Sequence, residues 1–128
     1  PMSKEDLIKN SDIISIHLVL GERYKNLITK KEIEMMKKTS FLINTSRGPI
    51  INENDLVEAL KEETIMGAGL DVYEKEPSVH KNLVQLKNVF LLPHLGSATT
   101  ETREAMGMRV FENIQAFFNN KEPIDRVV

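Results

Sequence analysis

The amino-acid sequence predicts an α/β fold, part of a doubly wound, Rossmann-like parallel sheet of about four strands with flanking helices. Short apolar runs typical of buried strands alternate with segments whose apolar residues recur at helical spacing. Successive runs lie roughly 20 to 25 residues apart, which is long enough for a helical crossover between parallel strands. Polar residues gather directly after each run, at the edge where open α/β sheets bind their ligands.

Four apolar runs predict the strands, near residues 12–18, 40–45, 65–73 and 89–92. The run at 40–45 is almost continuously apolar, which is typical of a parallel strand buried on both faces. Gly67 and Gly69 lie inside the third run and indicate close approach of a neighbouring backbone. These glycines superficially resemble a nucleotide-binding loop, but a third glycine and a following helix are absent from this segment of the sequence.

Capping residues and apolar spacing predict the helices. Thr29 and Glu32 form a capping box before a short helix, and Asn52 is expected to cap a second one. A long final helix is expected over about 99–120. We interpret the methionines at helical positions as core residues and not as ligands; they are Met35, Met36, Met106 and Met108.

The composition narrows the possible functions of these 128 residues. Seventeen Lys and Arg against nineteen Asp and Glu give a net charge of −2, so nucleic acid is not an expected partner. The absence of cysteine and the three scattered histidines predict that there is no metal site. Every apolar run is far shorter than the roughly 20 residues that span a bilayer. We therefore expect one soluble domain with no membrane partner. A cytoplasmic location is a further expectation.

Arg47 follows the second predicted strand and is a candidate for binding an anion. Its planar guanidinium can hold a carboxylate through two parallel hydrogen bonds, and Gly48 would leave room for a substrate beside the backbone. The alternative is an arginine at a strand end that pairs with a surface acid. The sequence leaves both interpretations open.

Three further candidates follow the third and fourth strands. His94 can act as a general acid or base near neutral pH, or can have only a structural role. Glu76 could hydrogen-bond the imidazole of that histidine, or be an ordinary loop residue. Asp71 could accept a hydrogen bond from an amide-bearing ligand, or form an Asx-turn. Of the other histidines, His17 could border a ligand and His80 is expected to be solvated.

Three motifs, taken together and in this order, resemble those of the D-isomer-specific 2-hydroxyacid dehydrogenases. They are NTSRGP at 44–49, GLDVYEKEP at 69–77 and PHLGSAT at 93–99. The resemblance runs from about Ser11 to the carboxyl end. It implies an oxidoreductase that transfers a hydride between NAD(H), with NADP(H) not excluded, and a D-2-hydroxy acid/2-oxo acid pair, without a metal.

The resemblance also implies roles for individual residues. Arg47 would bind the substrate carboxylate, His94 would be the acid/base, and Glu76 would orient the histidine. Leu18 and Val19 would lie on the adenosine side of the cofactor, and Gly96 near the reacting ring. The full set of implied cofactor-binding residues is Leu18, Val19, Thr45, Ser46, Arg47, Asp71, His94 and Gly96.

The glycine-rich phosphate loop of this family lies upstream of all three motifs. We therefore expect residues 1–128 to be a partial NAD-binding domain without its amino-terminal half, and to be inactive alone. The first strand would then be an unpaired edge that favours self-association. The family resemblance implies a homodimer for the parent protein. The alternatives are an NAD-sensing corepressor or scaffold relative, or a catalytically inactive half-domain.

Overall fold

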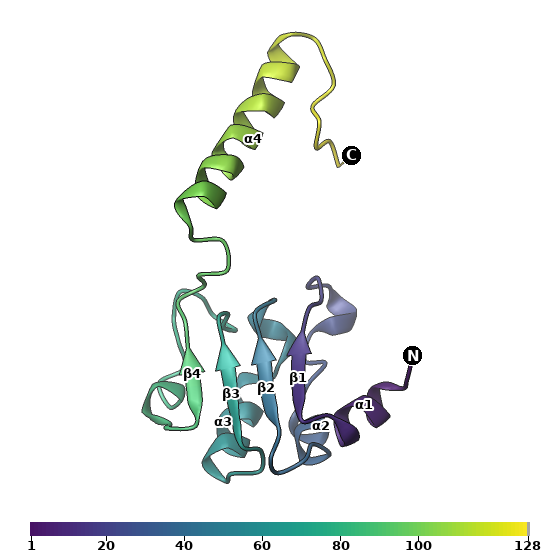
Figure 1. Ribbon diagram of the computed structural model, residues 1–128, viewed down its shortest axis with the longest axis vertical. Helices are drawn as coiled ribbons and strands as arrows, with labels where there is room; N and C mark the ends of the chain where they lie inside the picture. The colour runs from purple at the N-terminus through teal and green to yellow at the C-terminus, as the bar shows by residue number, and fades with distance from the viewer. Residues whose placement is uncertain (128) are drawn as a thin grey trace. The chain divides into compact units, whose positions relative to one another are not determined.

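A parallel sheet organises the first part of the chain. The computed structural model describes residues 1–127 and divides the chain into two units, Pro1–His94 and Leu95–Val128. Within the described residues the first unit holds four strands in the order β1-β2-β3-β4, and all neighbours are parallel (Figure 1). The strands are β1 Ile13–Ile16, β2 Phe41–Asn44, β3 Gly67–Leu70 and β4 Val89–Leu91. The predicted fold class is confirmed, and each strand lies inside its predicted range.

Helices cover one face of this sheet. Every second residue of a strand faces the helices, and Ile14 and Leu42 are two of these residues. They form a buried cluster with Leu56 and Leu60, which lie on a helix. In the first unit the helices are α1 Lys4–Asn10, α2 Lys30–Glu34 and α3 Glu53–Lys61, with short 3-10 turns η1 Glu22–Tyr24, η2 Gly48–Ile50 and η3 Leu83–Gln85. The right-handed crossovers of a parallel sheet explain why successive helices lie on the same side.

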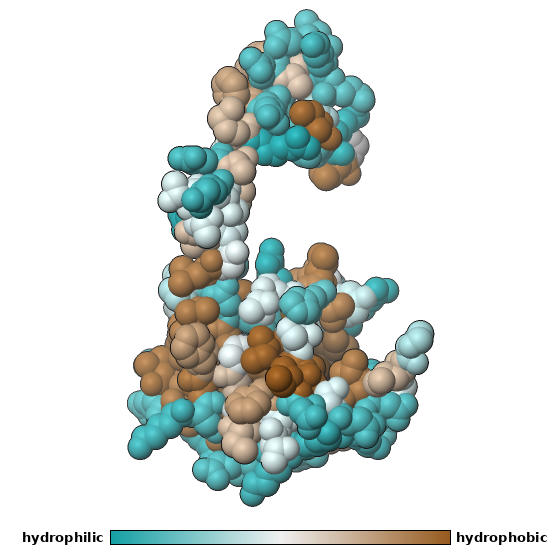
Figure 2. Space-filling model, viewed as in Figure 1, coloured by the Kyte–Doolittle hydropathy of each residue, from teal (hydrophilic) through white to brown (hydrophobic). Residues whose placement is uncertain are grey.

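Apolar side chains are exposed on the opposite face of the sheet. Ile13, Phe41 and Phe90 are all exposed there, and Figure 2 shows apolar residues gathered over the sheet. A Cβ atom at Gly67 would lie 2.6 Å from the carbonyl oxygen of Asn88 and 3.1 Å from the Phe41 ring. The predicted close approach of a neighbouring backbone at this glycine is therefore confirmed.

The predicted helix caps are present. The amide and hydroxyl of Thr29 donate to one Glu32 carboxylate oxygen at 3.0 and 2.6 Å, and Lys4 Nζ donates to the other at 2.9 Å. The Asn52 side chain accepts from the Asp55 amide at 3.1 Å. Burial alone would raise the pKa of Glu32, but the hydrogen bonds from Thr29 and Lys4 outweigh it and lower the pKa to about 2.

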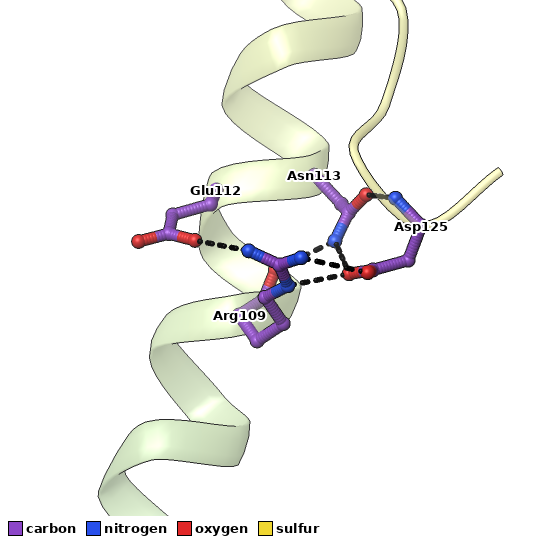
Figure 3. A network of polar contacts seen from close by, with 4 residues as sticks. All are labelled: Arg109, Glu112, Asn113 and Asp125. Carbon is purple, nitrogen blue, oxygen red and sulfur yellow. Dashed lines mark hydrogen bonds and ion pairs between the residues drawn. The ribbon is translucent and has the colours of Figure 1, made fainter.

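The second unit is built on α4, Thr100–Phe118. Figure 3 shows Asp125 beside this helix, where it accepts from Arg109 Nε and Nη2 at 2.7 and 2.8 Å and from Asn113 at 2.7 Å. The Asp125 amide in turn donates to the Asn113 side chain at 2.9 Å. These charge-assisted hydrogen bonds fold the chain after α4 back along the helix.

The interpretation of all four methionines as core residues is partly wrong. Met36 is buried and Met35 is packed against the core, whereas Met106 and Met108 of α4 are 56% and 55% exposed. An apolar stripe on a helix is buried only where another element packs against it. Helical spacing alone therefore did not predict whether Met106 and Met108 are buried. Among residues 1–127, none of the helices is both long enough and apolar enough to cross a membrane.

Glu32→Gln is expected to lower the free energy of unfolding at pH 7 by about 3 kcal/mol, because the folded protein lowers the pKa of this carboxylate from 4.5 to about 2. A depressed pKa stabilises the folded state above the unfolded pKa. The difference between wild type and variant should therefore shrink as the pH falls from 4.5 to about 2. Urea unfolding followed by circular dichroism measures both quantities. The control is Glu34→Gln, which alters an exposed carboxylate on the same helix. Equal losses in the two variants would contradict this account.

Candidate active site

An open cleft lies at the carboxyl ends of β1 and β2. Its volume is about 330 Å³. The cleft is lined by His17, Leu18, Val19, Leu20, Thr45, Ser46 and Arg47. Leu18 and Val19 after β1 thus share one cleft with Thr45, Ser46 and Arg47 after β2. All five are residues that the family resemblance implies for cofactor binding. Parallel strands end at the same edge, which explains why segments distant in sequence meet here.

Ser46 joins the two walls of the cleft. Its hydroxyl accepts from the Leu18 amide at 3.0 Å and donates to the Leu18 carbonyl oxygen. Both hydrogen bonds are made to backbone atoms, so they fix the loop after β1 against the loop after β2. The Ser46 side chain therefore shapes the cleft through contacts within the protein.

Arg47 is exposed at the start of η2, in a loop held by the buried side chain of Asn44. The side-chain nitrogen of Asn44 donates to the Arg47 carbonyl at 3.0 Å, and its side-chain oxygen accepts from the Ser46 amide at 3.1 Å. Arg47 Nη1 donates to the Ser46 carbonyl at 2.7 Å. In the described part of the chain Arg47 forms no ion pair within 4.0 Å, so the alternative of a paired surface arginine finds no support. A guanidinium group can bind an anion through its other donors.

Gly48 has a different role from the one predicted. It is buried, and a Cβ atom added to it would lie 1.9 Å from the carbonyl carbon of Tyr73 and 2.5 Å from the Glu74 amide nitrogen. The glycine therefore admits the backbone of the loop after β3. The sequence could not show this, because the two segments are distant in the chain.

Glu76 and His94 form a hydrogen-bonded pair. His94 Nδ1 lies 2.6 Å from Glu76 Oε2, and the Tyr73 amide donates to Glu76 Oε1 at 3.0 Å. The hydrogen bond from His94, followed by the one from Tyr73 and by the nearby charge of Arg47, lowers the pKa of Glu76. Glu76 is thus ionised near neutral pH, and Nδ1 must carry the proton that it shares with the carboxylate. The three candidate catalytic side chains lie at one edge of the sheet.

His94 uses one of its two ring nitrogens, Nδ1, in the contact with Glu76. The side chains of His94 and Glu76 are 45% and 33% exposed, and among residues 1–127 no protein group bonds Nε2. His94 has a backbone φ of 56°, in the left-handed region, which costs a non-glycine residue roughly 1–2 kcal/mol. Surrounding contacts must hold the backbone in that conformation.

Two buried residues near the site were missed in the sequence. Glu53, at the start of α3, accepts from the Glu74 amide at 2.8 Å and from the His80 amide at 3.3 Å. It thereby holds both ends of the loop that carries Glu76. The second missed residue is Asn44. The feature of the sequence that could have indicated it is a polar residue at the end of an apolar strand.

The remaining predicted residues lie in different environments. Asp71 is buried, and its amide donates to the Asn44 carbonyl at 3.0 Å. Gly96 belongs to the second unit, in a turn where the Ala98 amide donates to the Leu95 carbonyl at 3.0 Å. His80 was expected to be solvated, but it is half-buried and its Nδ1 accepts from the Asn82 amide at 3.2 Å. No group of three or more metal-ligating side chains occurs in the part of the chain described.

Comparison with known proteins extends these observations. A family model described as "D-isomer specific 2-hydroxyacid dehydrogenase, NAD binding domain" matches residues 1–96. The chain is 49% identical over 119 residues to a glyoxylate reductase of Thermococcus litoralis, covering 93% of this chain and 36% of that protein. The chain thus spans about a third of the length of the curated relatives it matches.

Solved structures show the same architecture. The TT0316 protein of Thermus thermophilus superposes with a TM-score of 0.94 at 38% identity, covering 99% of this chain and 41% of that one. An NADPH-dependent glyoxylate/hydroxypyruvate reductase of Sinorhizobium meliloti, in complex with NADP and malonate, gives a TM-score of 0.91 at 34% identity, over 95% of this chain and 38% of that one.

Gly48→Ala is expected to lower the free energy of unfolding by about 3 kcal/mol, because the new methyl group would overlap backbone atoms that cannot rotate away. Urea denaturation measures the loss. Gly21→Ala is the control, since an added Cβ there meets nothing within 4 Å and should change stability by less than about 0.5 kcal/mol. A Gly48→Ala protein as stable as the control would show that the contact with Tyr73 is not rigid.

The carboxyl group of Glu76 is expected to titrate below 4.5 in the wild-type chain and closer to 4.5 in His94→Ala, because the hydrogen bond from His94 is the main cause of the lowered pKa. Since the folded pKa is depressed, the contact is intact above pH 4.5 and is lost as the pH falls through that lowered value. Carbon-13 NMR of the side-chain carboxyl measures the midpoint. His17→Ala, which alters a histidine outside this pair, should leave the midpoint unchanged. An identical midpoint in His94→Ala would contradict the pairing.

Proposed function

Because the chain belongs to the D-isomer specific 2-hydroxyacid dehydrogenase family through the NAD-binding domain of that family, we propose that it carries the catalytic side chains of an oxidoreductase. The reaction interconverts a 2-oxo acid and a D-2-hydroxy acid. The hydrogen bond of 2.6 Å between Glu76 and His94 is the observation that carries this proposal. NAD(H) or NADP(H) supplies or accepts the hydride when bound.

The residues of the cleft fit part of such a cofactor. Val19 and Leu18 offer apolar contacts on the wall after β1, and Thr45 offers a hydroxyl on the wall after β2. A cleft of about 330 Å³ at the carboxyl ends of parallel strands suits a nucleotide or nicotinamide moiety. The cofactor is NAD or NADP, and the similarity to an NADPH-dependent reductase favours neither alone.

The proposed mechanism assigns one task to each catalytic side chain. Arg47 binds the carboxylate of the substrate and so fixes the position of its C2 atom. His94 Nε2 donates a proton to the C2 oxygen as the carbonyl becomes a hydroxyl, and accepts it in the reverse direction. Glu76, which is ionised, accepts a hydrogen bond from the Nδ1–H group and so fixes the tautomer and the orientation of the imidazole ring.

Small 2-oxo acids are the proposed substrate class. The similarity to glyoxylate reductases makes glyoxylate the first compound to test. The NAD-sensing corepressor alternative does not need an acid–base pair, so the intact contact between Glu76 and His94 favours the enzyme. A homodimer, a cytoplasmic location and the absence of nucleic acid among the partners stay predictions from the sequence.

A hybrid enzyme tests the proposal. This chain replaces the matching residues of the Thermococcus litoralis glyoxylate reductase, and oxidation of NADH or NADPH by glyoxylate is followed by absorbance. His94→Ala should lower kcat by about 10² to 10⁴-fold, because proton donation is lost. Arg47→Ala should mainly raise KM, because it removes binding of the substrate carboxylate.

Matched controls are available in the same hybrid. His80→Ala and Arg23→Ala remove a histidine and an arginine outside the site, and both should leave kcat and KM within about twofold of the unsubstituted hybrid. A folded hybrid without oxidation of either nicotinamide cofactor would overturn the proposed function. Near-normal kcat in His94→Ala would overturn the acid–base assignment alone.

A further inference from the structure

Tyr73 is in contact with every segment that carries a candidate catalytic residue. Its side chain is buried, and its hydroxyl donates to the Leu92 carbonyl oxygen at 2.7 Å, two residues before His94. Its amide donates to Glu76 at 3.0 Å. Its carbonyl carbon lies directly against Gly48, the neighbour of Arg47.

These contacts form a closed path that includes the Glu76–His94 pair. The path runs from the Tyr73 hydroxyl to Leu92, through Pro93 to His94, across to Glu76 and back to the Tyr73 amide. The Leu92 amide is also held, since it donates to the Leu70 carbonyl at 2.8 Å. Both backbone polar groups of Leu92 are therefore fixed two residues before His94, the residue at φ 56°.

The hydroxyl of Tyr73 is suited to this task. Burial, followed by the charges of Asp71 and Glu53, raises the pKa of Tyr73, so the phenol keeps its proton at ordinary pH and stays a donor. The longer distance of 3.4 Å to the Leu70 carbonyl leaves Leu92 as the main acceptor. Without the hydroxyl, the partly buried Leu92 carbonyl would lose this hydrogen bond.

We propose that Tyr73 is a positioning residue, whose hydroxyl holds the backbone before His94 so that the imidazole meets Glu76 and presents Nε2 to the substrate. The residue touches no reacting atom and acts through its neighbours. The effect on the reaction rests on the proposed function, whereas the effect on the pair of Glu76 and His94 does not.

Tyr73→Phe in this 128-residue chain tests the positioning, because it removes only the hydroxyl. The titration midpoint of the Glu76 carboxyl, measured by carbon-13 NMR, should rise toward 4.5 as the hydrogen bond from His94 loosens. Tyr24→Phe removes the other tyrosine hydroxyl of the chain, which contacts Arg23. In that control the Glu76 midpoint should not move.

Kinetics in the hybrid enzyme provide the second measurement. Tyr73→Phe should lower kcat about tenfold, because a misplaced imidazole transfers the proton less well, while KM for glyoxylate changes less than about twofold. An inactive unsubstituted hybrid would count against the proposed function and leave the NMR test intact.

A merely structural tyrosine predicts a different result. It would lower stability, measured by urea unfolding, without moving the Glu76 titration in the folded variant. A wild-type Glu76 midpoint in folded Tyr73→Phe overturns the proposal whatever the rate. A variant that unfolds overturns it too, since the hydroxyl would then support the whole domain and not His94 in particular.

Discussion

The close contact between the backbones of Gly48 and Tyr73 is the constraint on which the site depends. Only a residue without a Cβ lets the two loops approach this closely, as the distance of 1.9 Å from a hypothetical Cβ to the Tyr73 carbonyl carbon shows. One loop carries Arg47 and the other carries Glu76. The charge of Arg47 can lower the pKa of Glu76 because of this approach. The proposed site, with a group for an anionic substrate and a proton donor, is thereby assembled from two segments that the parallel sheet brings together.

Buried polar side chains hold the loops in place. The Asn44 side chain binds the loop that carries Arg47, and the Glu53 side chain binds both ends of the loop that carries Glu76. The Tyr73 hydroxyl binds the segment before His94. In residues 1–127 no buried side-chain nitrogen or oxygen lacks a hydrogen-bond partner. Since burial strengthens a satisfied hydrogen bond and makes an unsatisfied one costly, these groups define a single arrangement of the exposed side chains.

The sequence predicted what depends on neighbouring residues. The strands, the cap at Asn52 and the box of Thr29 and Glu32 follow from short-range patterns, and the structure has them. The roles of Gly48 and Tyr73 depend on a contact between loops that are far apart in the chain, so no local pattern indicated them. The exposure of Met106 was likewise not predicted, because helical spacing indicates an apolar stripe but not which other element covers that stripe. The motifs identified Arg47, Glu76 and His94 as candidates, but only the fold showed how they are held.

The division between exposed and buried groups separates two kinds of functional residue. Arg47 and the His94–Glu76 pair are exposed or half-exposed, so each can meet a substrate or stabilise a neighbour while contributing little to the core. Gly48, Asn44, Glu53 and Tyr73 are buried and make their contacts with backbone atoms. We expect substitution of an exposed residue of this set to change the rate or the substrate binding with little change in stability. Substitution of a buried residue is expected to change stability and the geometry of the site together. A residue such as Tyr73, from which a single hydroxyl can be removed without changing the shape of the core, is therefore the most direct place to separate positioning from folding.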